Sequence, residues 1–180
     1  MLSNRLFLYG TIKSDQPNHS FIPKEDPQRC RFLGTGKTET KWPLVIATKY
    51  NFPFLLDCEG EGYNVEGEVY EMDNGLLSYI DEKEGYPDHY ARRQVNIVLD
   101  KMADDPEPNT SKTLRCWYYL LPRFSPSVLA LEKYKSYDSY GAHGKQCIEV
   151  YDHKRKEWVE PIEKVHREIA LLHGTDEKCN

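Results

Sequence analysis

The chain opens on an apolar run that stops abruptly at a glycine. Residues 5–9 read Arg-Leu-Phe-Leu-Tyr, and Gly10 follows directly. A short continuous run of aromatic and branched residues predicts a buried strand, and the glycine predicts a tight turn. A residue without Cβ can take a positive φ and lets another group approach the backbone, so the outward amides of Thr11 and Ile12 suit an anion. Alternatively, Gly10 only ends the strand.

Further runs of β-forming residues follow along the chain. Turn residues separate these runs from one another. The runs predict strands at 42–48, 52–56, 65–72, 95–99 and 114–121. The first three are expected to form a meander. We expect the core to end near residue 121.

The sequence also predicts helices at three places in the chain. Residues 73–75 supply an N-cap, apolar residues at 76–80 follow at helical spacing, and Gly85 ends the helix. A second helix is expected at 127–135. Residues 161–172 carry apolar residues at i, i+3, i+7 and i+10 and predict an amphipathic helix. Its apolar stripe packs either on the same domain or against a partner.

One acidic residue does not fit its place on the first helix. At 100° per residue, Glu84 falls inside the apolar stripe formed by residues 76–80, whereas Glu82 points the opposite way. Burial, the neighbouring acids and the negative end of the helix dipole all predict a raised pKa for Glu84. Such a carboxyl is suited to taking and returning a proton. Alternatively, Glu84 frays into water or pairs with Arg92 or Arg93.

The composition limits the class of protein. The chain has 180 residues, of which 39% are hydrophobic and 29% charged, enough for one domain with a core and an appendage. The net charge of −5 is not massed in one segment, which argues against binding to nucleic acid or to an anionic membrane. No apolar run reaches the length of a signal-peptide core or a membrane span. We therefore expect a cytoplasmic protein whose partner is a small molecule or another protein. We also predict a monomer.

The sequence does not support a motif for binding a metal or a nucleotide, or for catalysis by a serine nucleophile. The five cysteines are widely scattered, and the six histidines lack ligand spacing, so neither a zinc site nor a disulfide framework is indicated. Residues 34–38, Gly-Thr-Gly-Lys-Thr, resemble the end of a phosphate-binding loop. That motif needs a further glycine at position 31, where this chain has Arg31. No Gly-x-Ser-x-Gly elbow is present.

Short motifs in a fixed order carry a family resemblance. They are Leu-Tyr-Gly-Thr-Ile-Lys at 8–13, Gln-Pro-Asn-His at 16–19, Pro-Leu-Val-Ile-Ala at 43–47, Val-Glu-Gly-Glu-Val-Tyr at 65–70, Ile-Asp-Glu-Lys-Glu at 80–84, Tyr-Ala-Arg at 90–92 and Tyr-Asp-Ser-Tyr-Gly-Ala-His-Gly at 137–144. Together they resemble the γ-glutamyl cyclotransferase superfamily (AIG2-like). The 16–19 motif and the 137–144 loop are similar to its amine-specific branch.

The resemblance implies a fold and a division of the chain. The fold class is α+β, a small mixed β-barrel with short helices, followed here by the C-terminal amphipathic helix. Residues 1–147 would form the γ-glutamyl cyclotransferase-like domain, and residues 148–180 a C-terminal extension beyond the family's usual end. One place for the extension's helix is over the mouth of the site, which would affect amine specificity.

The resemblance also implies an activity and its residues. The backbone around Tyr9, Gly10, Thr11 and Ile12 would bind the γ-glutamyl group, and Glu84 would be the catalytic acid and base. The expected reaction releases 5-oxoproline and a free amine from γ-glutamyl amines such as γ-glutamyl-ε-lysine, a product of transglutaminase crosslinks, with no metal or other cofactor. The alternatives are a γ-glutamyl dipeptide cyclotransferase and a non-enzymatic interaction protein on the same fold.

Overall fold

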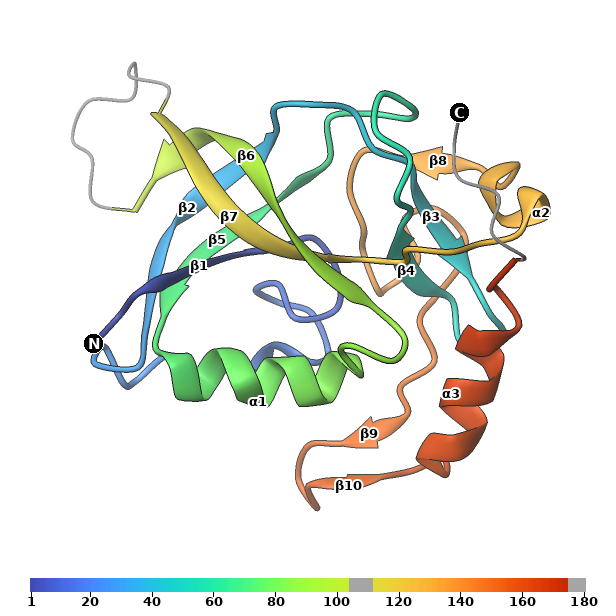
Figure 1. Ribbon diagram of the computed structural model, residues 1–180. Helices are drawn as coiled ribbons and strands as arrows, with labels where there is room; N and C mark the ends of the chain where they lie inside the picture. Colours follow the sequence, from blue (N-terminus) through green and yellow to red (C-terminus); the bar gives the residue numbers. More distant parts are fainter. Residues whose placement is uncertain (104–111, 175–180) are drawn as a thin grey trace.

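Five strands close into a barrel (Figure 1). The computed structural model describes residues 1–103 and 112–174. The strand order around the barrel is β1-β5-β2-β6-β7, and neighbours are antiparallel except β1 and β7, which run parallel. The bounds are β1 Asn4–Leu8, β2 Cys30–Thr38, β5 Glu66–Met72, β6 Ala91–Met102 and β7 Lys112–Leu120. The expected α+β barrel fold is confirmed.

Strand β1 is buried on both faces, as its continuous apolar run predicted. Leu6 and Leu8 belong to a hydrophobic cluster that includes the first long helix. Phe7 and Tyr9 belong to a second cluster, which is drawn mostly from strands. A strand that is covered on both faces does not need alternating polar and apolar residues. Strand β1 can therefore cross the core, and the turn that follows it lies in the interior.

Strand β2 was not expected, because its sequence contains the glycine-rich stretch 34–38. Gly34 has a φ of 147° and lies at a shift in the pairing between β2 and β5. A Cβ on Gly36 would lie 2.4 Å from the carbonyl oxygen of Val98 in β6. The two glycines therefore allow a bulge and a close approach between strands.

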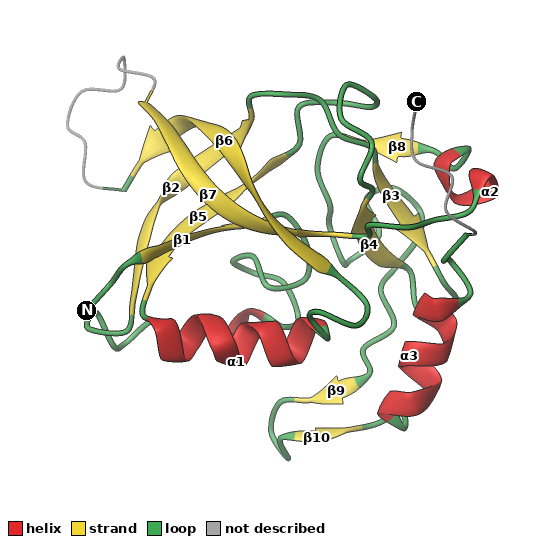
Figure 2. Ribbon diagram, in the orientation of Figure 1, coloured by secondary structure: helices red, strands yellow, loops and turns green. Residues whose placement is uncertain are grey.

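A second sheet lies beside the barrel, with the order β4-β3-β8 (Figure 2). Its strands are β3 Leu44–Ala47, β4 Phe52–Leu55 and β8 Lys133–Tyr134. The expected meander is wrong in its third strand, since β5 inserts between β1 and β2 of the barrel. The helix expected at 127–135 is wrong over its second half. Helix α2 spans only Pro126–Leu129, because residues 133–134 pair with β3.

Helix α1 spans Asn74–Glu84 and lies below the barrel in Figure 1. At its start, the Asp73 side chain accepts a hydrogen bond from the backbone N–H of Leu76 at 2.6 Å. At its end, Gly85 takes a left-handed conformation with a φ of 68°. The predicted cap and stop are confirmed. The apolar side chains of α1 are buried, and Glu84 is the last residue of the helix.

The C-terminal segment folds back against the rest of the chain. It contains a short hairpin and a helix: β9 Tyr151–Asp152, β10 Glu157–Trp158 and α3 Ile162–Ala170. Val165 and Ile169 of α3 are buried in the same cluster as α1. The amphipathic helix is therefore confirmed, and its stripe packs on its own chain. The expectation that the core ends near residue 121 is wrong.

The structure also describes the helix lengths that bear on a membrane span and the state of four cysteines. Among the described residues, no helix combines the length and apolarity needed to cross a membrane. Cys30, Cys116 and Cys147 are free thiols. Cys58 takes part in a disulfide bond, which the scattered spacing of the cysteines did not predict.

Candidate active site

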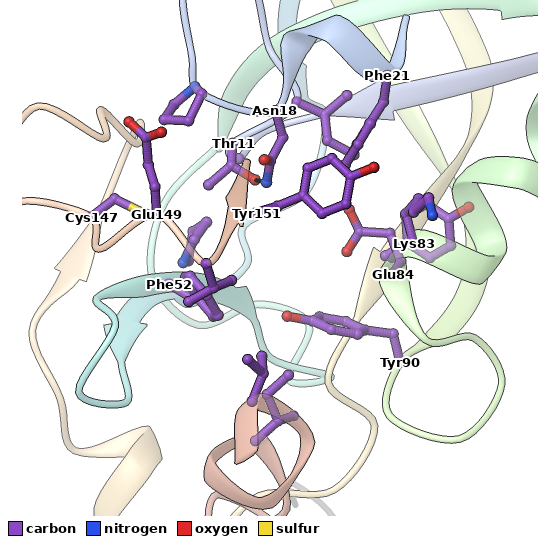
Figure 3. Close-up of a pocket in the computed structure, with 18 of the residues that line it drawn as sticks. Thr11, Asn18, Phe21, Phe52, Lys83, Glu84, Tyr90, Cys147, Glu149 and Tyr151 are labelled. Atoms are coloured by element: carbon purple, nitrogen blue, oxygen red, sulfur yellow. Dashed lines mark hydrogen bonds between the residues drawn. The ribbon is translucent and has the colours of Figure 1, made fainter. Parts of the chain in front are cut away.

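A cavity of about 120 Å³ lies between the first turn, the end of α1 and the C-terminal segment (Figure 3). All the residues that the sequence singled out line it: Tyr9, Gly10, Thr11, Ile12 and Glu84. A cavity of this size, lined by both polar and apolar side chains, holds several water molecules or part of a small substrate. The fold therefore brings the two candidate motifs together around one space.

Glu84 enters this cavity without a hydrogen-bond or ion-pair partner among residues 1–103 and 112–174. Burial, and then the charge of Asp81, raise its pKa from 4.5 to about 7. The predicted rise is thus confirmed. The alternative pairing is wrong, because Arg92 binds Asp81 at 2.6 Å and Arg93 binds Asp57 at 2.7 Å. Near pH 7 the Glu84 carboxyl can both accept and donate a proton.

Asp81, one turn earlier on α1, differs from Glu84 because its carboxylate accepts several hydrogen bonds. Its two carboxylate oxygens accept hydrogen bonds from Nη1 of Arg92 at 2.9 and 2.6 Å. One of them also accepts from the Tyr119 hydroxyl at 2.7 Å. The Arg92 guanidinium in turn lies over the Trp117 ring, 5.0 Å from its centroid. Asp81 is thus fixed in place, and its charge acts on the pKa of Glu84 from a constant position.

Tyrosine rings surround the Glu84 carboxyl. Tyr90 lines the cavity beside Glu84 (Figure 3), and the Tyr9 hydroxyl donates to the backbone carbonyl of Tyr119 at 2.9 Å. Burial is the largest cause that raises the pKa of Tyr9, Tyr90 and Tyr119, and the charge of Glu84 adds to it in each case. These phenols therefore stay protonated and do not compete for the proton that Glu84 carries.

The first turn offers backbone donors to the cavity. Within the described chain, the N–H groups of Gly10, Thr11 and Ile12 have no hydrogen-bond acceptor, while the N–H of Lys13 donates to the Gly10 carbonyl at 3.2 Å. Unpaired N–H groups beside a cavity can bind an anion. Gly10 does not take the positive φ that we expected. A Cβ there would lie 3.0 Å from Cγ of Pro53, so the glycine instead permits close packing.

The loop that contains the Tyr-Asp-Ser motif holds the turn in place. Nζ of Lys13 donates to the backbone carbonyl of Tyr137 at 2.8 Å. The backbone N–H of Ser139 donates to the side-chain oxygen of Gln16 at 2.7 Å. The 137–144 motif, found in the sequence only through the resemblance, therefore has a structural role at the site.

Comparisons with known proteins agree with this arrangement. The family model described as "Gamma-glutamyl cyclotransferase, AIG2-like" matches residues 6–139. This chain belongs to that family. The gamma-glutamylaminecyclotransferase of Mus musculus is 37% identical to this cyclotransferase over 139 residues, which are 77% of this chain and 92% of the mouse protein. The gamma-glutamylaminecyclotransferase of Homo sapiens is 37% identical over 141 residues, with 77% and 92% covered.

A solved structure shows the same fold. The crystal structure of an AIG2-like protein from Mus musculus matches this cyclotransferase with a TM-score of 0.74 and 31% identity. The match covers 85% of this chain and 100% of the mouse chain.

The C-terminal segment supplies a wall of the cavity that lies beyond residue 139, where the family match ends. Tyr151, Trp158, Val165 and Ile169 line the cavity from this segment. Sequence reasoning did not name them as site residues. For Val165 and Ile169 the signal was the apolar stripe of the last helix, which predicts that one face of the helix is buried but not against which residues. Tyr151 and Trp158 lie in β9 and β10, outside that stripe.

A chain of hydrogen bonds joins this segment to the first turn. Oγ of Ser20 lies 2.6 Å from Nδ1 of His153, and Nε2 of His153 lies 2.9 Å from the side-chain oxygen of Asn18. The Asn18 amide then donates to the Thr11 hydroxyl at 2.9 Å. Ser20 belongs to the short 3-10 helix His19–Phe21 that follows the turn. The turn is thus tied to both the 137–144 loop and the C-terminal segment.

Metal binding has no support in the part of the chain that the structure describes, where no group of three or more His, Cys, Asp or Glu is placed to hold an ion. The nearest arrangement is a packed set of histidines. The His89 ring lies 4.2 Å from the His166 ring and 6.5 Å from the His173 ring, centroid to centroid. Burial lowers the pKa of His166 and His173, and the rings pack together where α3 meets the loop after α1.

Proposed function

We propose that this cyclotransferase converts γ-glutamyl amines, such as γ-glutamyl-ε-lysine, to 5-oxoproline and the free amine. The observation that carries the proposal is the unpartnered Glu84 carboxyl, with a pKa of about 7, in a cavity beside the unpaired amides of the first turn. Relatives named gamma-glutamylaminecyclotransferase support the choice of substrate. Glu84 is the catalytic residue, and Tyr9, Gly10, Thr11 and Ile12 bind the γ-glutamyl group.

The substrate brings its own nucleophile. In a γ-glutamyl amide, the α-nitrogen lies one five-membered ring closure from the γ-carbonyl carbon, so the attack is intramolecular. The Glu84 carboxylate removes a proton from the α-ammonium group, which frees the lone pair of the nitrogen. The nitrogen then bonds to the γ-carbon, and the γ-oxygen gains negative charge.

Breakdown of this intermediate completes the proton transfers. The γ-carbonyl reforms, the bond between the γ-carbon and the leaving nitrogen breaks, and protonated Glu84 gives its proton to that nitrogen. Over the whole reaction the α-nitrogen loses two protons and the leaving amine gains two. The second proton follows the same route through Glu84 or through water. A carboxyl with a pKa near 7 suits both directions of transfer.

The amides of the first turn have a defined part in this scheme. The substrate carries an α-carboxylate, and its γ-oxygen becomes negative during the reaction. The unpaired N–H groups of Gly10, Thr11 and Ile12 are donors for either group. Because Pro53 and the 137–144 loop pack against the turn, these donors are held in position before the substrate binds.

The test is release of 5-oxoproline by the purified protein from γ-glutamyl-ε-lysine, γ-glutamyl-alanine and glutathione in parallel. We expect γ-glutamyl-ε-lysine to be cleaved fastest. Glu84→Gln keeps the shape of the side chain but cannot carry the proton, so kcat should fall by about 1000-fold. Glu82→Gln is the matched control, because Glu82 is an exposed acid on the same turn of α1.

Three outcomes of this experiment would contradict the proposal. Unchanged activity of Glu84→Gln would remove the catalytic role of Glu84. Preferred cleavage of γ-glutamyl-alanine would favour a dipeptide cyclotransferase. If no γ-glutamyl compound yields 5-oxoproline, the non-enzymatic alternative is favoured.

A further inference from the structure

Three consecutive backbone carbonyls of the first turn, at residues 10–12, each have a hydrogen-bond donor. Two of the donors are backbone N–H groups, those of Lys13 and Asn18, at 3.2 and 2.9 Å. The third is Nδ1 of His19, which lies 2.8 Å from the carbonyl oxygen of Ile12. Of these three bonds, only the one from His19 is made by a side chain.

These bonds also set the directions of the N–H groups in the turn. In a trans peptide the C=O and N–H groups share one plane and point in opposite directions. The Ile12 carbonyl shares its plane with the Lys13 N–H, which donates to the Gly10 carbonyl. The Gly10 carbonyl shares its plane with the Thr11 N–H, which has no acceptor within the described chain. The bond from His19 therefore acts on the direction of the Thr11 N–H through two peptide planes.

The contact with Ile12 also fixes the tautomer of the His19 ring. A carbonyl oxygen has no proton to donate, so Nδ1 carries the proton of this hydrogen bond. Nε2 is buried and has no hydrogen-bond partner among the residues that the structure describes. A second proton on Nε2 would be a buried donor without an acceptor there. His19 therefore holds the turn through its Nδ1–H group.

The barrel holds the His19 ring in place. The side chain is 7% exposed, and its ring neighbours that of Tyr70 in β5, 6.2 Å away between centroids. The Tyr70 hydroxyl donates to the Glu68 carboxylate at 3.0 Å, and the same carboxylate oxygen accepts from the backbone N–H of Ser14 at 2.8 Å. His19 itself does not line the cavity, so any effect on a substrate passes through the turn.

We propose that His19 is a positioning residue of this enzyme: its Nδ1–H holds the Ile12 carbonyl, so that the Thr11 N–H keeps the direction in which it binds the γ-glutamyl group. This inference rests on the proposed function. Donors that are oriented before the substrate arrives do not have to reorganise during the reaction. Without the bond from His19, the peptide plane that follows Ile12 loses one of its two anchors, and the Thr11 N–H is no longer held.

Two variants of His19 separate the hydrogen bond from the packing of the ring. Nδ2 of asparagine lies where Nδ1 of histidine does, so His19→Asn keeps the donor and leaves a cavity. His19→Leu fills more of the space and has no donor. We expect kcat/KM for γ-glutamyl-ε-lysine to fall by about tenfold in His19→Leu and to stay within about threefold in His19→Asn. Both variants should unfold at lower urea concentrations than the wild type, so activity should follow the donor and not the stability.

Thr38→Val is the matched control for the loss of a buried hydrogen bond. Oγ1 of Thr38 accepts from the backbone N–H of Val65 at 2.9 Å, and the side chain is fully buried and does not line the cavity. Thr38→Val should therefore lower the stability and leave kcat/KM unchanged. The proposal would be overturned if His19→Leu lost no activity, or if either His19→Asn or Thr38→Val lost as much as His19→Leu.

Nuclear magnetic resonance of the protein without a ligand keeps this inference separate from the proposed function. If no γ-glutamyl compound is turned over, the proposed function fails, and the spectra still test how the turn is held. The backbone amide signal of Thr11 should shift or broaden in His19→Leu and stay near its wild-type position in His19→Asn. An unchanged Thr11 signal in His19→Leu would overturn the proposal.

The ring nitrogens of His19 can be observed in the wild-type protein, so this measurement stands even if His19→Leu does not fold. We expect the ¹⁵N signals of the ring to show a proton on Nδ1 and a lone pair on Nε2. A proton on Nε2 alone would overturn the proposal, because Nδ1 could then not donate to the Ile12 carbonyl.

Discussion

The two walls of the cavity differ in how they treat polar groups. The barrel and α1 contribute a hydrogen-bonded network, in which Asp81 is bound by Arg92 and Tyr119 while Glu84 is left unpaired. The C-terminal segment contributes mainly apolar and aromatic side chains. The wall built by the barrel and α1 therefore combines a paired carboxylate in a fixed position with an unpaired carboxyl whose pKa is raised. The C-terminal wall contributes mostly surface for packing.

The same contrast appears within α1. Asp81 and Glu84 lie one turn apart, yet one is saturated with donors and the other has none among the described residues. Because Asp81 is bound by Arg92, its position is fixed, and its charge adds to the burial that raises the pKa of Glu84 to about 7. The predictions below test this division of roles.

The pH dependence of kcat/KM should show the largest effect. The reaction starts with ionised Glu84, whose pKa is about 7. Below that pH the base becomes protonated, so log kcat/KM should fall with a slope near one, and activity at pH 5 should be about 50-fold lower than at pH 7. Initial rates of 5-oxoproline release between pH 5 and 9 would measure it. A limb at pH 4.5 or below would assign the base to an ordinary carboxyl.

Arg92→Leu should destabilise the folded protein by about 2 kcal/mol. It leaves the Asp81 charge half-buried without its bidentate partner. The uncompensated charge should also raise the pKa of Glu84 further and move the limb of the pH profile to higher pH. Urea unfolding and the pH profile together would measure both effects.

Arg93→Leu is the control for this prediction. Arg93 pairs with Asp57 but is 54% exposed, so its loss should cost less than about 1 kcal/mol and leave the pH profile unchanged. Equal effects of the two variants would show that the Asp81 pair is an ordinary surface ion pair.

Glu84→Gln should stabilise the folded protein at alkaline pH. The pKa of Glu84 is higher in the folded protein, about 7, than its ordinary value of 4.5. Its contribution to stability is therefore fully present below pH 4.5 and is lost as the pH rises through 7. At pH 8 the variant should be more stable than the wild type by about 1–3 kcal/mol. Below pH 4.5 the two should unfold at similar urea concentrations, and a stability difference independent of pH would contradict the assignment.

His153→Ala should have the smallest effect. It removes the link between the C-terminal segment and Asn18, which in turn holds the Thr11 hydroxyl. We expect a rise of about threefold in KM for γ-glutamyl-ε-lysine, with little change in kcat. An unchanged KM would show that this link does not help to position the first turn.

Much of the side of the cavity that carries Glu84 was predictable because its signals are local. The apolar run before Gly10 and the position of Glu84 on the helical wheel depend only on short stretches of sequence. The same applies to the cap at Asp73 and the stop at Gly85. The choice of Arg92 as the partner of Asp81 rather than Glu84 depends on how β6 passes α1, which no local pattern contains.

The elements that were missed depend on contacts between distant residues. Strand β2 was hidden by glycines that serve a bulge and a close strand approach. Residues 133–134 pair with β3 instead of continuing a helix. The aromatic wall around Tyr151 forms only when β9, β10 and α3 pack against the first turn. In each case contacts between residues far apart in the sequence determined the structure, and the local sequence preference for helix or strand did not.

The order in which this chain is synthesised has a consequence for when it can act. The turn after β1 and the Glu84 carboxyl emerge from the ribosome before residues 147–169, several of which line the same cavity. Until they dock, water reaches Glu84 and the desolvation that raises its pKa is weaker. A nascent chain, or a product of premature termination after residue 147, would therefore carry the first turn and Glu84 and still lack part of the environment that raises the pKa of Glu84.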